Sequence, residues 1–183
     1  MKARTKPAVP EKRMRVKRTL MGRVAVAVVL AALTLPGVAA TSGSHVSAAG
    51  CQTPFLVYTD PDNPGTVQET GAFQRVTGSG LLGRYDGDGR FAGYSINGLQ
   101  DAEVNTATGM ANVRGIFTAT SPDGGSSIEV HYTGQVDFGA GMAKGVFTAS
   151  GERGNDAGYN ASGAIEGTVV GPATLDGADV GLC

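Results

Sequence analysis

Tryptophan is absent from the chain, and histidine and cysteine each occur only twice in 183 residues. Without indole rings, a barrel that binds biotin or stacks against sugars is disfavoured. Two cysteines are too few for a structural zinc site, which takes four ligands. One histidine, His45, precedes the region expected to fold, so His131 has no second histidine beside it in the domain. The sequence therefore predicts no metal site and no cofactor.

A long hydrophobic run is also missing. The apolar residues 24–35 are too few to span a bilayer, which takes about 20 residues in a helix. This run follows nine of the fifteen basic residues, is ended by Pro36 and precedes small residues at 38–40. The pattern is typical of a cleaved bacterial signal peptide, which we place at residues 1–40. The long basic segment leaves three candidate starts of translation: Met1, Met14 and Met21.

The exported chain is then expected to begin with a flexible leader, residues 41–50, followed by a single domain, residues 51–183. Residues 48–51 (AAGC) resemble a lipoprotein cleavage box, which would attach a lipid to Cys51. However, this box lies well beyond the apolar run, and lipidation would leave Cys183 without a partner. We therefore predict a secreted, extracellular protein with no membrane contact after cleavage, and keep a lipid anchor at Cys51 as the alternative.

Positive charge is scarce in the predicted exported chain. Removing residues 1–40 takes away nine of the fifteen bases and one of the sixteen acids, which leaves six bases, fifteen acids and a net charge of −9. Such a chain repels phosphate backbones and anionic lipids, so nucleic acid is not an expected partner. The usual consequence of this charge is solubility outside the cell.

Within the domain, one short segment is repeated. Residues 115–120 (GIFTAT) return as residues 145–150 (GVFTAS), and each copy is followed by a glycine-rich turn and a second alternating segment. Two alternating segments around a turn are typical of a β-hairpin. No stretch keeps an apolar stripe at helical spacing for three turns. The pattern predicts an all-β fold: a small antiparallel barrel of about eight strands or, alternatively, a β-sandwich.

Alternation along these segments separates a polar face from an apolar one, because successive side chains in a strand point to opposite sides. Gly115 and Gly145 fall on the apolar face, where a glycine indicates a bend or a close approach of another strand. The side chains expected to point inward, and to line any ligand-binding lumen, are Val113, Phe117, Val130, Tyr132, Val136, Phe138 and Phe147.

Cys51 opens the predicted domain and Cys183 closes it. In an oxidising compartment an even pair of cysteines is most simply a disulfide, which would join the two ends of the domain. Closing so long a loop contributes about 4–5 kcal/mol in the chain-entropy model. Ends that meet also suit a closed barrel, in which the first and last strands can be neighbours.

Residues 75–171 resemble the secreted β-barrels of the allene oxide cyclase type, which include the plant dirigent proteins. The resemblance rests on a Gly-x-Phe strand that leads through a Gly/Ser turn into residues 127–134 (SIEVHYTG), on a glycine series in residues 151–163, and on the terminal cysteines. Asp156 stands where the family has Phe, and none of the family's ligand-steering acids finds a match. The resemblance implies an eight-stranded barrel with an apolar lumen and carries over no activity.

No catalytic residue is predicted. A Gly-x-Ser-x-Gly elbow is absent, and Ser, Asp and His do not follow a recognisable triad order. Glu129 and His131 share one face, but the alternation turns both to solvent. The inward faces of the clearest strands contain no carboxylate, and Tyr132 is the only titratable side chain expected inside, as a core tyrosine with a satisfied hydroxyl. Residues 86–89 (DGDG) begin like a calcium loop but lack its glutamate at the twelfth place.

These observations favour a secreted barrel that binds a small apolar ligand in its lumen and has no identifiable catalytic machinery. Two alternatives stay open. One is a structural or interaction protein of the cell envelope, or a protein inhibitor that presents residues 59–66 as an exposed loop. The other is a cyclase or isomerase of the allene oxide cyclase kind, which needs at least one polar group in the lumen. Strand order and oligomeric state do not follow from the sequence.

Overall fold

The computed structural model describes residues 51–171 and 173–183, so the predicted signal peptide (1–40) and leader (41–50) lie outside the described residues. The described chain holds nine strands and one short 3₁₀ helix, η1 (Gly154–Asp156). The strands are β1 (Gln52–Thr59), β2 (Thr66–Thr70), β3 (Phe73–Tyr85), β4 (Ser95–Asn105), β5 (Met110–Thr120), β6 (Ser127–Asp137), β7 (Met142–Arg153), β8 (Asn160–Gly171) and β9 (Thr174–Val180).

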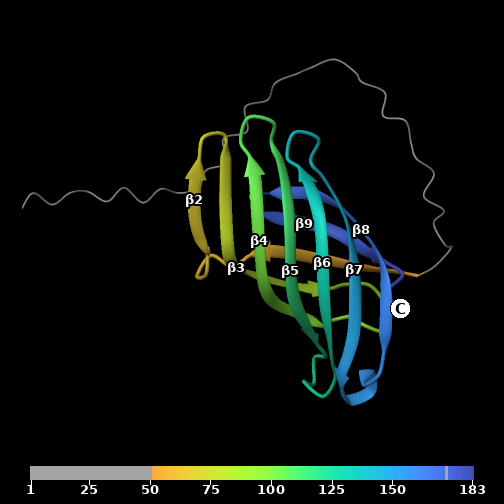
Figure 1. The fold of residues 1–183 in the computed structure, drawn as a ribbon. Coiled ribbons are helices and arrows are strands. Elements are labelled where there is room, and N and C mark those ends of the chain that lie inside the picture. The colour runs from red at the N-terminus through yellow and green to blue at the C-terminus, as the bar shows by residue number, and fades with distance from the viewer. Residues whose placement is uncertain (1–50, 172) are drawn as a thin grey trace, which may run out of the picture.

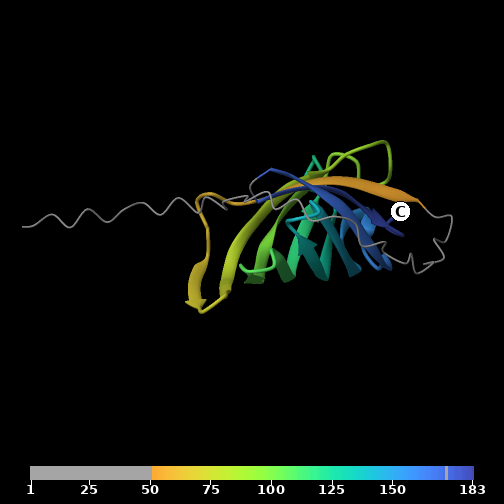
Figure 2. The ribbon, with the colours of Figure 1, turned by 90° about the horizontal axis from the view of Figure 1, so that it is seen from above.

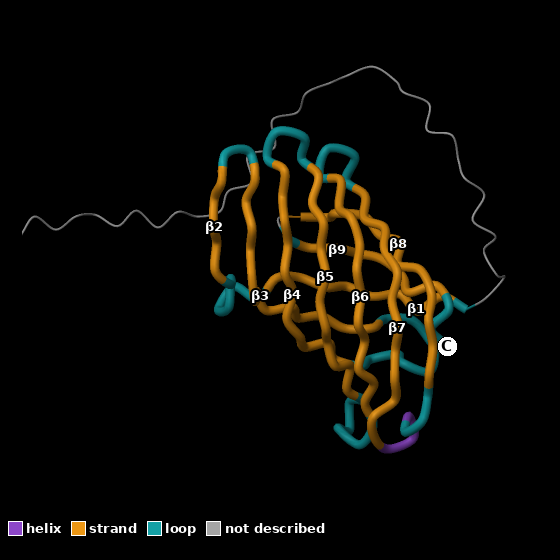
Figure 3. Tube along the Cα trace, in the orientation of Figure 1, coloured by secondary structure: helices purple, strands orange, loops and turns teal. Residues whose placement is uncertain are grey.

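All nine strands belong to one antiparallel sheet that closes on itself (Figures 1 and 3). The order is β1-β9-β8-β7-β6-β5-β4-β3-β2, and an additional pairing between β1 and β3 completes the ring. Strand β3 pairs with β4 along one edge, and along its other edge the first half pairs with β2 and the second half with β1. Eight strands thus form a closed barrel, with β2 as an extra strand beside it, which confirms the predicted barrel over the sandwich.

Seen from above, β1 and β9 lie opposite the curved sheet that β4 to β7 form (Figure 2). The duplicated segments are β5 and β7, which flank β6 on either side. Their phenylalanines, Phe117 and Phe147, are both buried. A Cβ atom on Gly115 would lie 2.6 Å from the carbonyl oxygen of Leu99, and one on Gly145 would lie 2.5 Å from that of Thr133. Both glycines are therefore required for a close approach between neighbouring strands.

One end of the barrel is filled by side chains. The connection between β3 and β4, residues 86–94, folds over this end and contributes the buried rings of Phe91 and Tyr94. Leu182, also fully buried, enters the same cluster from the C-terminal segment. The ring centroid of Phe91 lies 5.4 Å from that of Tyr94 and 5.3 Å from that of Tyr159, in edge-to-face contacts that favour tight aromatic packing.

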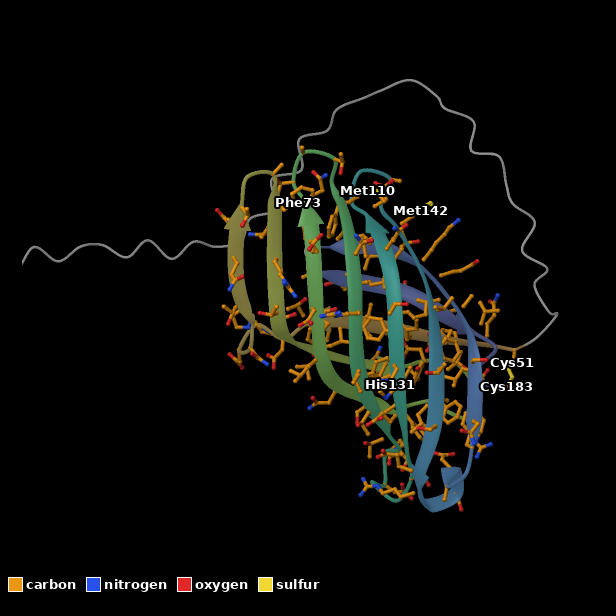
Figure 4. The ribbon with its side chains drawn as sticks, viewed as in Figure 1. Cys51, Phe73, Met110, His131, Met142 and Cys183 are labelled. Atoms are coloured by element: carbon orange, nitrogen blue, oxygen red, sulfur yellow. A yellow bond between two sulfur atoms is a disulfide. The ribbon has the colours of Figure 1, made fainter. Side chains whose placement is uncertain are left out.

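Cys51 and Cys183 form a disulfide at this filled end, with 5.7 Å between their Cα atoms, which confirms the predicted pairing (Figure 4). The seam is also held by hydrogen bonds. The amide of Gly181 donates to the carbonyl of Cys51 at 3.0 Å, and the hydroxyl of Thr53 donates to the carbonyl of Leu182 at 2.5 Å. Within the described residues, no helix has the length and apolar character to cross a membrane.

Candidate functional site

The barrel encloses a cavity of about 350 Å³ toward the end opposite the aromatic cluster. Its walls come from every barrel strand and are mostly apolar, with Pro64 of the β1–β2 connection and Val67 of β2 beside it. Wall residues near the turns between strands are Val76, Val104, Val136, Phe138, Val169 and Ala173. Exposed apolar side chains of Phe73, Met110 and Met142 lie at the same end, close to these turns (Figure 4).

The seven side chains expected to point inward all do so, but they occupy two different environments. Five of them border the cavity, and one of these, Phe117, also belongs to the buried cluster. Val130 and Phe147 belong to that cluster alone. The five that border the cavity are Val113, Phe117, Tyr132, Val136 and Phe138. Alternation predicts the face of a strand, but the level at which the barrel is filled depends on side chains from other strands.

Tyr132 is connected to the cavity wall by a short chain of hydrogen bonds. Its hydroxyl donates to Oε1 of Gln100 at 3.1 Å, and Nε2 of Gln100 donates to the hydroxyl of Thr59 at 3.2 Å. Burial raises the pKa of Tyr132 above its ordinary value, so this hydroxyl stays protonated. Tyr132 is therefore a core tyrosine with a hydrogen-bonded hydroxyl, as predicted. This hydroxyl borders the cavity but already has a partner for its proton.

Tyr132 is not the only titratable side chain inside the barrel, so that expectation is wrong. Asp179 on β9 is 2% exposed, faces inward and borders the cavity. Its Oδ2 accepts a hydrogen bond from the hydroxyl of Tyr85, a fully buried residue of β3. Burial raises the pKa of Asp179 from 3.8 to about 7, although the hydrogen bond from Tyr85 acts in the opposite direction. Burial also raises the pKa of Tyr85, and the nearby carboxylate adds to that effect.

The sequence did not predict the buried pair of Asp179 and Tyr85, and the reason is physical. Leu175, Gly177 and Asp179 alternate along β9, but only one of the three is a large apolar residue, so the strand lacks a recognisable inner face. Aspartate is also rarely buried without a cation. The sequence signal that could have revealed Asp179 is the Leu-x-Gly-x-Asp alternation of residues 175–179. It becomes visible only if this segment is taken as a barrel strand.

A second buried carboxylate, that of Asp156 in η1, has a cation as partner. Nη2 of Arg90 lies 3.0 Å from its Oδ1, and the hydroxyl of Tyr94 donates to its Oδ2 at 2.9 Å. The Arg90 guanidinium also lies over the ring of Tyr159, 4.7 Å from its centroid. These contacts connect η1 with the segment of residues 86–94 and hold the filled end together. This carboxylate therefore has a structural role, away from the cavity.

Replacing Arg90 with methionine is expected to lower the free energy of unfolding by about 2–3 kcal/mol, because the buried carboxylate of Asp156 then loses its cation. Urea denaturation at pH 7 measures the change. Arg84→Met is the matched control, since the Arg84–Asp86 pair is solvent-exposed on both sides and should contribute little. Equal losses in the two variants would contradict the structural role of Asp156.

On the outer face, Nε2 of His131 lies 2.7 Å from Oε1 of Glu129. His131 is exposed and Glu129 is half-buried, on the polar face that the alternation predicts. Within the described part of the chain, no group of three or more His, Cys, Asp or Glu side chains is arranged to hold a metal ion. Comparison with protein-family models, with curated proteins and with solved structures finds no match. The cavity and Asp179 are therefore the features of this structure that bear on function.

Proposed function

We propose that this protein is an exported barrel that binds one small, mostly apolar ligand in its cavity. The observation that carries the proposal is the apolar cavity of about 350 Å³, which falls in the size range of small-molecule sites. An eight-stranded barrel can fill its interior with side chains or leave space for one ligand. Here both occur, because aromatic rings fill one end and mainly small or β-branched residues line the other.

Apolar walls supply affinity without direction, since burial of apolar surface contributes roughly 25 cal/mol per Å² regardless of orientation. Orientation requires a few polar groups, and the cavity has them in Gln100, Tyr132 and Asp179. The first two are hydrogen bonded to each other, which leaves Asp179 as the polar group with the most distinctive environment. An apolar chamber with few polar contacts is the usual composition of a small-molecule site.

Filling the cavity should abolish binding. Val113→Trp places an indole in the chamber and is expected to weaken binding of the neutral dye N-phenyl-1-naphthylamine at least tenfold, measured by fluorescence titration. Asn112→Trp is the matched control, because Asn112 neighbours Val113 on β5 but is exposed on the outer face. If neither the parent protein nor the control binds the dye, or if Val113→Trp binds it equally well, the proposal is wrong.

The cyclase or isomerase alternative has one observation in its favour, since the polar group that it requires in the lumen is present as Asp179 with Tyr85. The resemblance to the allene oxide cyclase type stays a prediction. The interaction alternative relies on residues 59–66 as a rigid, exposed loop. The amide of Asp60 donates to the carbonyl of Gly80 at 2.9 Å and that of Gly80 to the carbonyl of Asn63 at 2.8 Å, so this segment is held against β3, while residues 61–64 stay exposed. That alternative stays a prediction, and ligand binding is the function that we propose first because the apolar cavity supports it.

A further inference from the structure

We propose that the ligand of this cavity carries a protonated amine that pairs with the carboxylate of Asp179, while its apolar body fills the chamber. This inference rests on the proposed function and specifies its ligand class. It follows from the position of Asp179, from the single hydrogen bond that its carboxyl group accepts, and from the charges that face it.

The position of Asp179 makes it reachable from the cavity. It stands on β9 opposite Thr53 of β1 and Ile165 of β8, and both Asp179 and Thr53 are buried. Tyr85, its hydrogen-bond partner, belongs to the filled end, whereas Asp179 itself borders the chamber. The carboxyl group thus lies where the solid part of the barrel gives way to the cavity. Asp179 therefore lies at the inner end of the cavity, where the leading polar group of an entering ligand would arrive.

One oxygen of this carboxyl group is available. Oδ2 accepts the hydrogen bond from Tyr85, and within the described residues Oδ1 has no hydrogen-bond partner. In this part of the chain, every completely buried side-chain oxygen or nitrogen has a hydrogen-bond partner. Oδ1 must therefore keep some accessible surface, and the space beside Asp179 is the cavity. A ligand donor placed there would complete the hydrogen bonds of the carboxylate.

The charges around Asp179 favour a cationic donor. Tyr85 on β3 faces Asp179, and Tyr159 lies near Tyr85. Thr53 and Ile165, opposite Asp179 on the adjacent strands, do not ionise. Lys144 borders the cavity through β7, but it is exposed on the outer face, between the inward positions 143 and 145. No described cation therefore pairs with Asp179. Asp156, in contrast, has Arg90, which shows how this fold neutralises a buried carboxylate that has no ligand.

The negative charge of Asp179 determines which ligand headgroup would bind best beside it. A carboxylate would repel Asp179, and an alcohol would form a neutral donor's hydrogen bond to it. An ammonium group forms a charge-assisted hydrogen bond, roughly twice as strong, and supplies the missing positive charge. Burial that raises the pKa of Asp179 also indicates how poorly this carboxylate is stabilised when the cavity holds no cation. An apolar amine is therefore the ligand class that the site fits.

The test compares three probes with the same hydrocarbon chain: n-octylamine, 1-octanol and octanoate. Each displaces N-phenyl-1-naphthylamine from the purified protein at pH 8, where Asp179 is mostly ionised and the amine is protonated. Octylamine is expected to bind at least tenfold more tightly than octanol, and octanoate most weakly. In Asp179→Asn, octylamine should fall to the level of octanol, while octanol changes less than about threefold.

Lowering the pH provides a second readout. Octylamine binding to the parent protein should weaken between pH 8 and pH 5, because Asp179 becomes protonated, and this dependence should vanish in Asp179→Asn. Tyr85→Phe retains the carboxylate but removes the hydrogen bond that favours its charged form, so the midpoint of this pH dependence should move upward. The tyrosine variant also keeps the test decisive should Asp179→Asn fail to fold.

The outcomes separate the two proposals. If octanol and the dye bind but octylamine gains nothing over octanol, or if Asp179→Asn keeps the preference for the amine, the headgroup inference is overturned and the binding function stands. A preference for octanoate would overturn it as well. If none of the three probes and no dye binds to the parent protein, the proposed function itself fails.

Discussion

Replacing both Cys51 and Cys183 with serine is expected to lower the free energy of unfolding by about 3–5 kcal/mol. The two residues are 132 positions apart, so the disulfide closes nearly the whole described chain into one loop. Closing a loop of this length removes much of the conformational freedom of the unfolded chain, which the chain-entropy model values at about 5 kcal/mol. Since domains of this size have about 5–15 kcal/mol of stability in total, the loss is large.

The barrel should nevertheless stay folded in the serine variant, because β1 remains paired with both β9 and β3. The hydrogen bonds of Thr53 with Leu182 and of Gly181 with Cys51 also do not depend on the sulfur atoms. Urea denaturation followed by circular dichroism measures the loss. The parent protein under a reductant is the control and should match the variant, which should itself not respond to the reductant. A double variant within 1 kcal/mol of the parent would contradict the prediction.

Asp179→Asn is expected to stabilise the protein at pH 8 by about 2–4 kcal/mol. In the folded state the pKa of Asp179 is about 7, raised by burial from 3.8. Between these two values the folded state holds a proton that the unfolded state has released, so the free energy of unfolding falls as the pH rises toward 7. Above pH 7 the loss is complete. Asparagine cannot ionise, and its side-chain oxygen can still accept the hydrogen bond from Tyr85.

Urea denaturation of both proteins between pH 4 and pH 8 tests this prediction. The difference between variant and parent should be near zero or slightly unfavourable at pH 4 and should grow in favour of the variant up to about pH 7. Other carboxylates cancel in this difference. Among them is Asp101, whose pKa is lowered first by the backbone amide of Gly78 and then by Arg114. A difference that is constant with pH would show that Asp179 titrates normally in the folded protein.

A residue that destabilises its own fold at neutral pH is informative about function. Such costs concentrate at binding and catalytic sites, because a group arranged for a ligand is not satisfied in the ligand's absence. Asp179 fits this description, since it borders the cavity and lacks a cation. Asp156 does not fit it, because Arg90 and Tyr94 already satisfy its carboxylate. The stability measurement and the amine-binding experiment therefore examine the same residue by independent means.

The sequence by itself determined the strands β5 to β8 of the barrel wall and their inward faces. Alternation is a local property, because each strand residue points to the side opposite its neighbour, so the inward positions of Phe117 and Phe147 followed from the repeat alone. The joined ends of the domain followed from the presence of only two cysteines. The excess of acidic residues followed from composition.

Only the tertiary structure decided how the barrel closes and what it contains. Closure depends on β3, which pairs with β2 in one half and β1 in the other, and no local pattern encodes that division. The boundary between aromatic cluster and cavity depends on residues 86–94, which fold back over one end. Asp179 and Tyr85 are 94 positions apart, and the burial of a carboxylate contradicts its ordinary preference. Non-local pairing placed Asp179 inside the barrel, where local periodicity predicts only apolar residues.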